Sequence, residues 1–312
     1  MKSILITGAL GHIGSGFIHS LRLGDFERVV LVDNFFTQRY SSLFNLPEKV
    51  KFEFIEADIM KTDLINLFRG IDIIIHLAAI TNAEGSFDIQ DKVEQVNYDG
   101  TKRVAEACIE AGSKLIFIST TSVYGTQESI VNEACSESEL QPQSPYAKSK
   151  LQAEKLLEEL GRTHNLEFIT CRFGTIYGVS IGMRFHTAVN KFVWQACCGH
   201  SITVWKTALH QKRPYLSLFD AIRALNFIIT NNIFDREVYN VLTDNMTVDE
   251  ISRTIKKFVS GLEVSYVDSR IMNQLSYTVS CDKFKSLGFE FKGQLSTDIK
   301  ETVQLLSNIR SR

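Results

Sequence analysis

The sequence predicts an α/β fold in which a doubly wound parallel sheet is followed by a smaller C-terminal lobe. In the first half, short apolar runs alternate with stretches of helical periodicity, which is typical of parallel strands joined by crossover helices. A glycine-rich turn lies between the first apolar run and the first helical stretch. After Phe173 the alternation becomes irregular. We therefore expect a first domain over residues 1–175 and a substrate-binding lobe over residues 176–312, with a segment near 211–235 returning to the first domain.

The expected strands of the first domain are its apolar runs, at residues 4–7, 29–33, 51–55, 71–76, 115–119 and 168–173. The expected helices between them repeat apolar residues every three to four positions, at residues 13–23, 63–68, 93–111 and 145–160. In the second half we expect helices at residues 187–199, 218–230 and 247–259, and a strand at residues 202–205.

Composition and charge exclude several classes of protein. The 312 residues include 34 basic and 36 acidic side chains, a net charge of −2 that gives no electrostatic footprint for nucleic acid or an anionic membrane. No window approaches about 18 apolar residues, so no transmembrane helix is expected. The six cysteines lack metal-ligand spacing and suggest reduced thiols. We expect a cytoplasmic protein without a bound metal.

The glycine-rich turn reads Thr7-Gly8-Ala9-Leu10-Gly11-His12-Ile13-Gly14. Glycines between a strand and a helix allow a tight turn and close approach of a pyrophosphate, which would lie at the helix N-terminus. Asp33 ends the second expected strand, where a carboxylate binds a ribose 2′-hydroxyl and repels a 2′-phosphate. The pattern predicts a Rossmann domain that binds NAD. Its expected contacts are Gly8, Gly11, His12, Ile13, Gly14, Asp33 and Asn34.

A second motif, Ser144-Pro145-Tyr146-Ala147-Lys148-Ser149-Lys150, places a tyrosine and a lysine one helical turn apart. An ammonium beside a phenol favours the phenolate, so we expect Lys150 to lower the pKa of Tyr146. A tyrosine in that state can take a hydroxyl proton while a nicotinamide takes the hydride.

With these motifs the chain resembles the extended short-chain dehydrogenase/reductases that act as nucleotide-sugar epimerases and dehydratases. The resemblance covers nearly the whole length and is densest before residue 180. It implies that Asp58 and Ile59 contact the adenine and that His76-Leu77-Ala78-Ala79 lines the cofactor. It also implies a structural role for Asn97.

The resemblance also divides the catalytic work. Tyr146 is the base, Lys150 tunes it and holds the nicotinamide ribose, and Thr120 hydrogen-bonds the sugar oxygen. In 4,6-dehydratases of this family an Asp-Glu pair follows that threonine, and decarboxylases have Glu at the second position. Here the two positions are Thr121 and Ser122, whose hydroxyls need an activating partner to act as acid or base. Dehydration and decarboxylation are therefore disfavoured.

In the C-terminal half, the resemblance implies further substrate contacts. Arg213 matches the family arginine that grips the substrate diphosphate, and Asn190 matches a diphosphate-contacting asparagine. Arg184 is a further candidate, and Thr175 stands where the family usually has asparagine. A second family arginine has no counterpart in residues 273–277, and Arg270 is a nearby residue that we do not assign to that role. With Thr121 and Ser122, these residues form the expected substrate site.

We expect an enzyme that uses NAD to oxidise C4 of a nucleotide-linked sugar. Return of hydride to the other face would make it a 4-epimerase, which we place slightly ahead of a 4-dehydrogenase that releases the ketosugar. The stretches Met183-Arg184-Phe185 and Tyr277-Thr278-Val279-Ser280 also resemble enzymes that oxidise GDP-linked heptose at C4. A third reading is an NAD-binding regulatory protein without catalysis, which would have no need of Thr120, Tyr146 and Lys150 together.

The resemblance further implies a homodimer, formed through the helices near residues 93–111 and 145–160. The apolar stripe of the first of these helices could equally face the sheet. Its members are Val104, Ala105, Cys108 and Ile109. Assembly of cell-surface polysaccharides is the usual setting of such enzymes.

Overall fold

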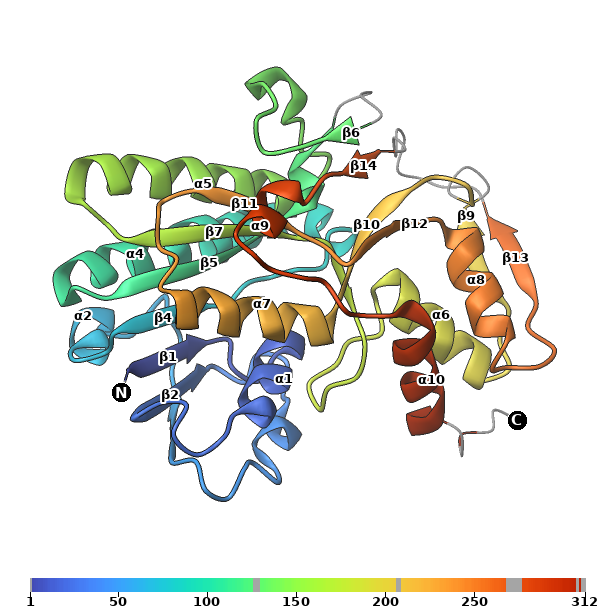
Figure 1. Ribbon diagram of the computed structural model, residues 1–312, viewed down its shortest axis with the longest axis horizontal. Helices are drawn as coiled ribbons and strands as arrows, with labels where there is room; N and C mark the ends of the chain where they lie inside the picture. Colours follow the sequence, from blue (N-terminus) through green and yellow to red (C-terminus); the bar gives the residue numbers. More distant parts are fainter. Residues whose placement is uncertain (1, 126–129, 206–208, 268–276, 307–308, 310–312) are drawn as a thin grey trace.

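The computed structural model describes residues 2–125, 130–205, 209–267, 277–306 and 309. It confirms the predicted fold class: a seven-stranded parallel sheet forms one lobe, and smaller sheets with three helices form the other (Figure 1). The strand order of the large sheet is β11-β7-β5-β4-β1-β2-β3. Its strands are β1 (Ser3–Thr7), β2 (Arg28–Asp33), β3 (Phe52–Glu56), β4 (Ile73–His76), β5 (Lys114–Thr120), β7 (Phe168–Phe173) and β11 (Val238–Val241).

Helices cover both faces of this sheet, which explains why its central strands are continuously apolar. The helices are α1 (His12–Ser20), α2 (Leu64–Phe68), α3 (Gln90–Glu94), α4 (Gly100–Ala111), α5 (Pro145–His164) and α7 (Leu218–Asn231). Side chains alternate along a strand, so Ile4 and Ile6 of β1 pack with α1 and α7, whereas Leu5 packs with α2, α4 and α5. All three side chains have no exposed surface.

The strand order reverses between β1 and β4, and ligands of open parallel sheets bind beside such a reversal at the carboxyl ends of the strands. The segment after β4 is held in place by hydrogen bonds to Asn97. This residue lies in a π-helical turn (Gln95–Asp99) between α3 and α4. Its Oδ1 accepts from Ile80 N (2.8 Å), and its Nδ2 donates to Ile80 O (2.9 Å) and Ser149 Oγ (3.1 Å). The amide therefore ties the end of β4 to α5.

The second lobe is built around its own apolar core, which includes Val193, Ile202, Ile251 and Ile299. Its helices are α6 (Ala188–Cys197), α8 (Val248–Lys256) and α10 (Leu295–Leu306), beside the strand pair β9 (Ile202–Trp205) and β13 (Val264–Val267). A three-stranded sheet contains β8 (Thr175–Tyr177), β10 (Arg213–Ser217) and β12 (Asp244–Met246). A short strand pair, β6 (Ile130–Val131) with β14 (Thr278–Val279), and the helix α9 (Asp282–Ser286) complete the described strands and α-helices.

The segment that returns to the first lobe differs in extent from the sequence-based expectation. Residues 213–217 form β10, which pairs with β8 and β12 instead of joining the large sheet. The return consists of α7, which packs beside α1, and β11, which pairs in parallel with β7. The structure therefore places the returning segment at residues 218–241.

The apolar stripe of α4 faces the sheet. Val104, Ala105 and Cys108 are fully buried in the core, and on the outer face Lys102 Nζ lies 4.0 Å from Glu106 Oε1. All six cysteines are free thiols. Within the described residues, no helix has the length and apolar character needed to cross a membrane.

Candidate active site

A cavity of about 480 Å³ opens at the carboxyl ends of the central strands and is lined by both lobes. The first lobe contributes the glycine-rich turn, the end of β5 and the start of α5, and the second contributes β8, the segment that follows it and the start of β10. The predicted residues that line it are Gly8, Gly11, His12, Ile13, Gly14, Leu77, Ala79, Thr120, Thr121, Ser122, Tyr146, Lys150, Thr175, Arg184 and Arg213.

The glycine-rich turn has the form that a dinucleotide requires. Gly8 adopts a positive φ of 66°, and a Cβ there would lie 2.6 Å from Ala78 N, so no larger residue fits. The turn leads into α1 at His12, where the free N–H groups and the helix dipole favour an anion. The backbone approach and the helix terminus therefore fit the diphosphate of NAD.

Asp33 ends β2 beside this turn. Its Oδ2 accepts from Leu10 N (3.1 Å) and its Oδ1 from Phe35 N (3.0 Å). Burial raises the pKa of Asp33, while these N–H groups and the charge of Arg39 act in the opposite direction. The carboxylate is thus held in place at the end of the strand, where a ribose hydroxyl is expected.

Like Asp33 and Ala78, the predicted cofactor residues Asn34, Asp58 and Ile59 do not line the cavity. Asn34 is exposed, and its Oδ1 accepts from Phe36 N (3.0 Å). After β3, Asp58 Oδ1 accepts from Met60 N (2.9 Å), and Ile59 packs into the core. Pairing of β2 with β3 places this segment next to Asp33.

His76, which the family resemblance predicts to line the cofactor, lies at the end of β4 and lines the cavity. Thr101 Oγ1 donates its proton to Asn97 O (2.6 Å), so it accepts from His76 Nε2 (3.2 Å). His76 Nδ1 then accepts from Thr7 Oγ1 (2.8 Å). Desolvation, together with the charge of Lys150, lowers the pKa of His76 to about 3. The ring is therefore neutral, and both of its nitrogens are hydrogen-bonded where it lines the cavity.

The structure brings Thr120, Tyr146 and Lys150 together. Ser144 caps α5 by accepting from Ala147 N (3.2 Å), which sets the first turn and directs Tyr146 and Lys150 to the cavity. Thr120 Oγ1 accepts from Ser122 N (3.1 Å) and is hydrogen-bonded to the Tyr146 phenol. The phenol and a fixed hydroxyl are thus adjacent, as the hydride-transfer prediction requires.

The predicted effect of Lys150 on Tyr146 needs correction. Burial raises the pKa of Tyr146, and the groups that act against burial are Arg184 and the Thr120 hydroxyl. Lys150 Nζ donates to Ile118 O (2.9 Å) and lies 4.6 Å from the Phe117 ring centroid. Desolvation lowers the pKa of Lys150 to about 7, although the negative charge of Glu154 acts to raise it. The cation that favours the phenolate in this structure is Arg184.

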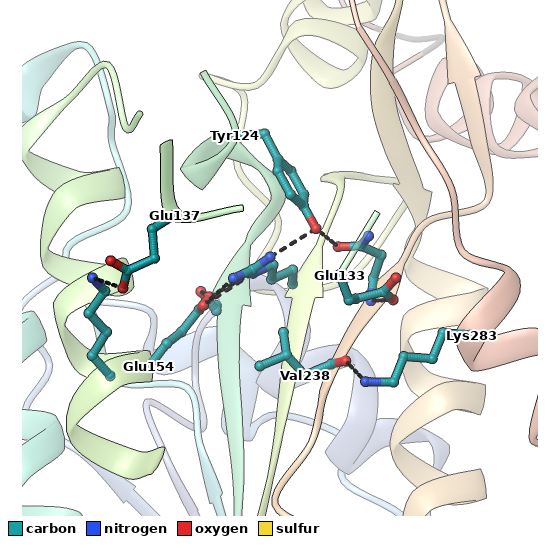
Figure 2. A network of polar contacts seen from close by, with 10 residues as sticks. Tyr124, Glu133, Glu137, Glu154, Val238 and Lys283 are labelled. Carbon is teal, nitrogen blue, oxygen red and sulfur yellow. Dashed lines mark hydrogen bonds and ion pairs between the residues drawn. The ribbon is translucent and has the colours of Figure 1, made fainter. Parts of the chain in front are cut away.

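Behind Lys150, a buried network joins α5 to β7 (Figure 2). Arg172 Nη2 donates to Glu154 Oε2 (2.7 Å), and its Nη1 donates to Tyr124 Oη (2.9 Å). Tyr124 in turn donates to Asn240 Oδ1 (2.9 Å), and Ser119 Oγ donates to the Glu154 carboxylate. The Arg172 and Glu154 side chains are each 5% exposed. This network fixes the strand end that carries Thr120.

The two positions after Thr120 present hydroxyl groups. Thr121 is buried and donates to Phe173 O (3.3 Å), whereas Ser122 is exposed at the cavity. Thr175 lines the same region from β8. Among the described residues that line the cavity, the one carboxylate is Glu84, an exposed residue of the loop after β4.

Arg213 lines the opposite side of the cavity and lies 5.0 Å from the ring centroid of Tyr277. The Tyr277 phenol donates to Thr121 O (3.3 Å), which connects this arginine to the strand end of Thr120. Arg270 and the stretch from Asn273 to Ser276 lie outside the described residues.

Asn190 does not line the cavity. It is fully buried on α6, where its Oδ1 accepts from Gly178 N (3.2 Å) and its Nδ2 donates to Arg184 O (2.9 Å). Backbone groups thus occupy both ends of the amide in this structure. Arg39, which has no motif around it, lies near the charges of Asp33 and Arg184.

The family assignment follows from comparison with known proteins. Residues 4–241 match the model of the NAD dependent epimerase/dehydratase family, and the chain belongs to this family. It is an NAD-dependent nucleotide-sugar epimerase/dehydratase of the extended short-chain dehydrogenase/reductase type, as the sequence predicts. NAD is its cofactor.

Its relatives include both dehydratases and epimerases. The chain is 30% identical to the dTDP-D-glucose 4,6-dehydratase of Mus musculus, with 97% of this chain and 88% of that protein aligned. It is 30% identical to the trifunctional UDP-glucose 4,6-dehydratase/UDP-4-keto-6-deoxy-D-glucose 3,5-epimerase/UDP-4-keto-L-rhamnose-reductase of Arabidopsis thaliana, with 97% of this chain aligned, but it spans only 46% of that protein.

Among solved structures, a variant of UDP-glucuronic acid 4-epimerase from Bacillus cereus superimposes with a TM-score of 0.88. Its sequence is 27% identical, and the match covers 98% of this chain and 99% of that one. That structure contains UDP-4-deoxy-4-fluoro-glucuronic acid and NAD.

His12 predicts a loss of stability in acid. Its Nε2 donates to Gly178 O (2.9 Å), and burial lowers its pKa to about 4 from 6.5. Because the unfolded chain binds this proton first as the pH falls, the stability contributed by neutral His12 is present above about pH 6.5 and lost towards pH 4. His12→Gln keeps an Nε2 donor without that titration. Denaturant titrations at neutral pH and at pH 5 give the fall in the free energy of unfolding for each protein. This fall should be smaller in the variant than in wild type, by on the order of 2 kcal/mol. Equal losses in both proteins would contradict this account.

Proposed function

We propose that this enzyme is a nucleotide-sugar 4-epimerase that oxidises the sugar C4 hydroxyl through Tyr146 and returns hydride to the opposite face. The observation that carries the proposal is the composition of the site. Thr120, Tyr146 and Lys150 converge in one cavity, while the positions beside Thr120 hold hydroxyls where a dehydratase needs acid and base. The 4-epimerase from Bacillus cereus supports the proposal through its TM-score of 0.88.

The mechanism divides between the two lobes. Tyr146 accepts the proton of the C4 hydroxyl as C4 loses hydride, and it returns that proton to O4 when hydride comes back. Thr120 holds the sugar oxygen against the phenol, and Lys150 would hold the nicotinamide ribose. NAD, when bound, would supply reversible hydride-transfer chemistry at C4. Arg213 binds the substrate diphosphate, for which a planar guanidinium is suited.

Epimerisation needs space for the ketosugar to turn between the two hydride transfers. The cavity provides this on the side of Thr121, Ser122 and Thr175, because these side chains are short. Arg213 and Tyr277 lie on the diphosphate side and can keep the nucleotide anchored while the sugar turns. The short hydroxyl side chains thus favour turnover within the cavity.

The test is the mass of the product from a panel of UDP-, GDP-, dTDP- and CDP-linked sugars with NAD. UDP-glucuronic acid belongs in the panel because the Bacillus cereus epimerase acts on it. A new chromatographic peak of unchanged mass supports a 4-epimerase and identifies its substrate. A product lighter by two hydrogens identifies a dehydrogenase, and one lighter by one water identifies a dehydratase. Either lighter product would overturn the proposal.

A further inference from the structure

Residues 178–184 belong to the connection between β8 and α6 and lie across the glycine-rich turn. We call this segment the strap. Three of its contacts join it to the start of α1. His12 Nε2 donates to Gly178 O (2.9 Å), Ser180 Oγ donates to His12 O (2.9 Å), and Gly182 N donates to Ser15 Oγ (2.9 Å). A segment of the second lobe is therefore fastened to the helix end where the cofactor diphosphate is expected.

The strap is also closely packed and held from behind. A Cβ on Gly182 would lie 2.4 Å from Leu10 O, so the strap backbone touches the glycine-rich turn directly. Asn190 of α6 accepts from Gly178 N and donates to Arg184 O, which are the two ends of the strap. The buried amide thus fixes the shape of the segment, and this is the role the structure gives to Asn190.

Two arginines flank the same turn from opposite lobes. Arg184, at the end of the strap, lines the cavity and donates to Thr81 Oγ1. Arg39 precedes a short helix, Tyr40–Leu43, which is attached to the turn through a bond from Ser42 Oγ to Leu10 O (2.9 Å). Within the described residues, neither guanidinium forms an ion pair closer than 4 Å.

The two guanidinium groups repel each other and lie near the positive end of α1. Burial, with the charge of Arg39 acting in the same direction, lowers the pKa of Arg184 to about 10. Burial also lowers the pKa of Arg39, although the negative charge of Asp33 acts to raise it. His12 is affected by both arginines, which places both charges close to the first turn of α1. Such an arrangement is stabilised by an anion with more than one charge.

We propose that the strap, Arg184 and Arg39 form a clasp over the diphosphate of NAD and retain the cofactor between catalytic cycles. The proposal moves Arg184 from the substrate site to the cofactor site. It rests on the NAD dependence of the family and is independent of which sugar reaction the enzyme performs. Its functional consequence is that NAD release requires the strap to detach from α1.

The test is the dissociation of NAD from the purified holoprotein, followed by chasing radiolabelled NAD with an excess of unlabelled NAD. Arg184→Ala and Arg39→Ala should each accelerate dissociation by about ten- to a hundredfold, since each removes a charge-assisted contact. Gly182→Ala keeps both charges but forces the strap off the turn, and should accelerate dissociation as well. Arg213→Ala is the matched control: it removes a cavity arginine from the other side and should change NAD dissociation by less than about twofold.

The clasp would be overturned if Arg184→Ala and Arg39→Ala released NAD at the wild-type rate. A rise in KM for the nucleotide sugar with unchanged NAD release would assign Arg184 to the substrate instead. Melting temperatures of the cofactor-free variants show whether the fold is intact, and the two arginine variants decide the matter even if Gly182→Ala does not fold. Product mass, measured separately, tests the epimerase proposal, so the two can fail independently.

Discussion

Replacing Tyr146 with Phe should reduce turnover by about a hundred- to ten-thousandfold, the range supplied by a positioned general acid–base group. The phenol is the group that lies against the Thr120 hydroxyl in the cavity, and phenylalanine retains the ring while removing the proton acceptor. The backbone bond from Tyr146 N to Ser86 Oγ (3.4 Å) does not involve the lost hydroxyl. The loss should therefore appear in kcat, with NAD binding and melting temperature close to wild type.

A matched control for this variant is Tyr277→Phe. That phenol also borders the cavity, but it donates only to Thr121 O (3.3 Å). Its removal should cost less than about tenfold, because one neutral hydrogen bond contributes roughly 1 kcal/mol. Initial rates at saturating substrate separate the two variants. Turnover of Tyr146→Phe at the wild-type rate would show that another group accepts the proton.

Replacing Glu154 with Gln should destabilise the protein by about 3–5 kcal/mol, because it leaves the buried Arg172 guanidinium without its counter-charge. Both side chains are 5% exposed, and Arg172 donates to Glu154 through both Nε and Nη2. For a chain of this size, the expected fall in melting temperature is on the order of 10 °C. Differential scanning calorimetry of the purified variant measures it.

The control is an ion pair whose lysine, Lys155, lies on the same helix as Glu154. Lys155 Nζ is 2.8 Å from Glu137 Oε1, but both side chains are more than half exposed (Figure 2). Glu137→Gln should leave the melting temperature almost unchanged, since solvent screens an exposed pair. A double variant, Glu154→Leu with Arg172→Met, should be less destabilised than Glu154→Gln, because no charge is left buried. Equal melting temperatures for Glu154→Gln and Glu137→Gln would contradict the assigned role of the buried network.

The central strands before Phe173, β1, β2, β4 and β5, could be predicted because helices bury both of their faces, which makes each of them a continuous apolar run. The apolar pattern did not predict the strand Val238–Val241. Its Asn240 interrupts the apolar pattern, yet the residue is fully buried because its side chain bonds Tyr124 and Ser280 O (3.0 Å). Those partners lie far away in the sequence, and no local pattern reveals them.

The same distinction applies to the site. Tyr146 and Lys150 are one helical turn apart, so local spacing alone predicts that they share a face. Asn190 and Arg39 instead depend on contacts with residues that no local motif links to them. The amide of Asn190 bonds both ends of the strap, and the Tyr40–Leu43 helix that follows Arg39 is attached to the glycine-rich turn at Leu10. The pKa of Tyr146 likewise depends on Arg184, a residue of the other lobe.

The most direct test of the account is the fate of deuterium placed on C4 of the nucleotide sugar that the product-mass panel identifies. Hydride that leaves C4 and returns to the opposite face within one closed site should remain on C4. We therefore predict an epimer of unchanged mass that keeps the deuterium on C4, with no accumulation of reduced cofactor. Deuterium found in free NADH would show that the ketosugar departs, and deuterium on another sugar carbon of a product lighter by water would show dehydration. Either result would contradict the account.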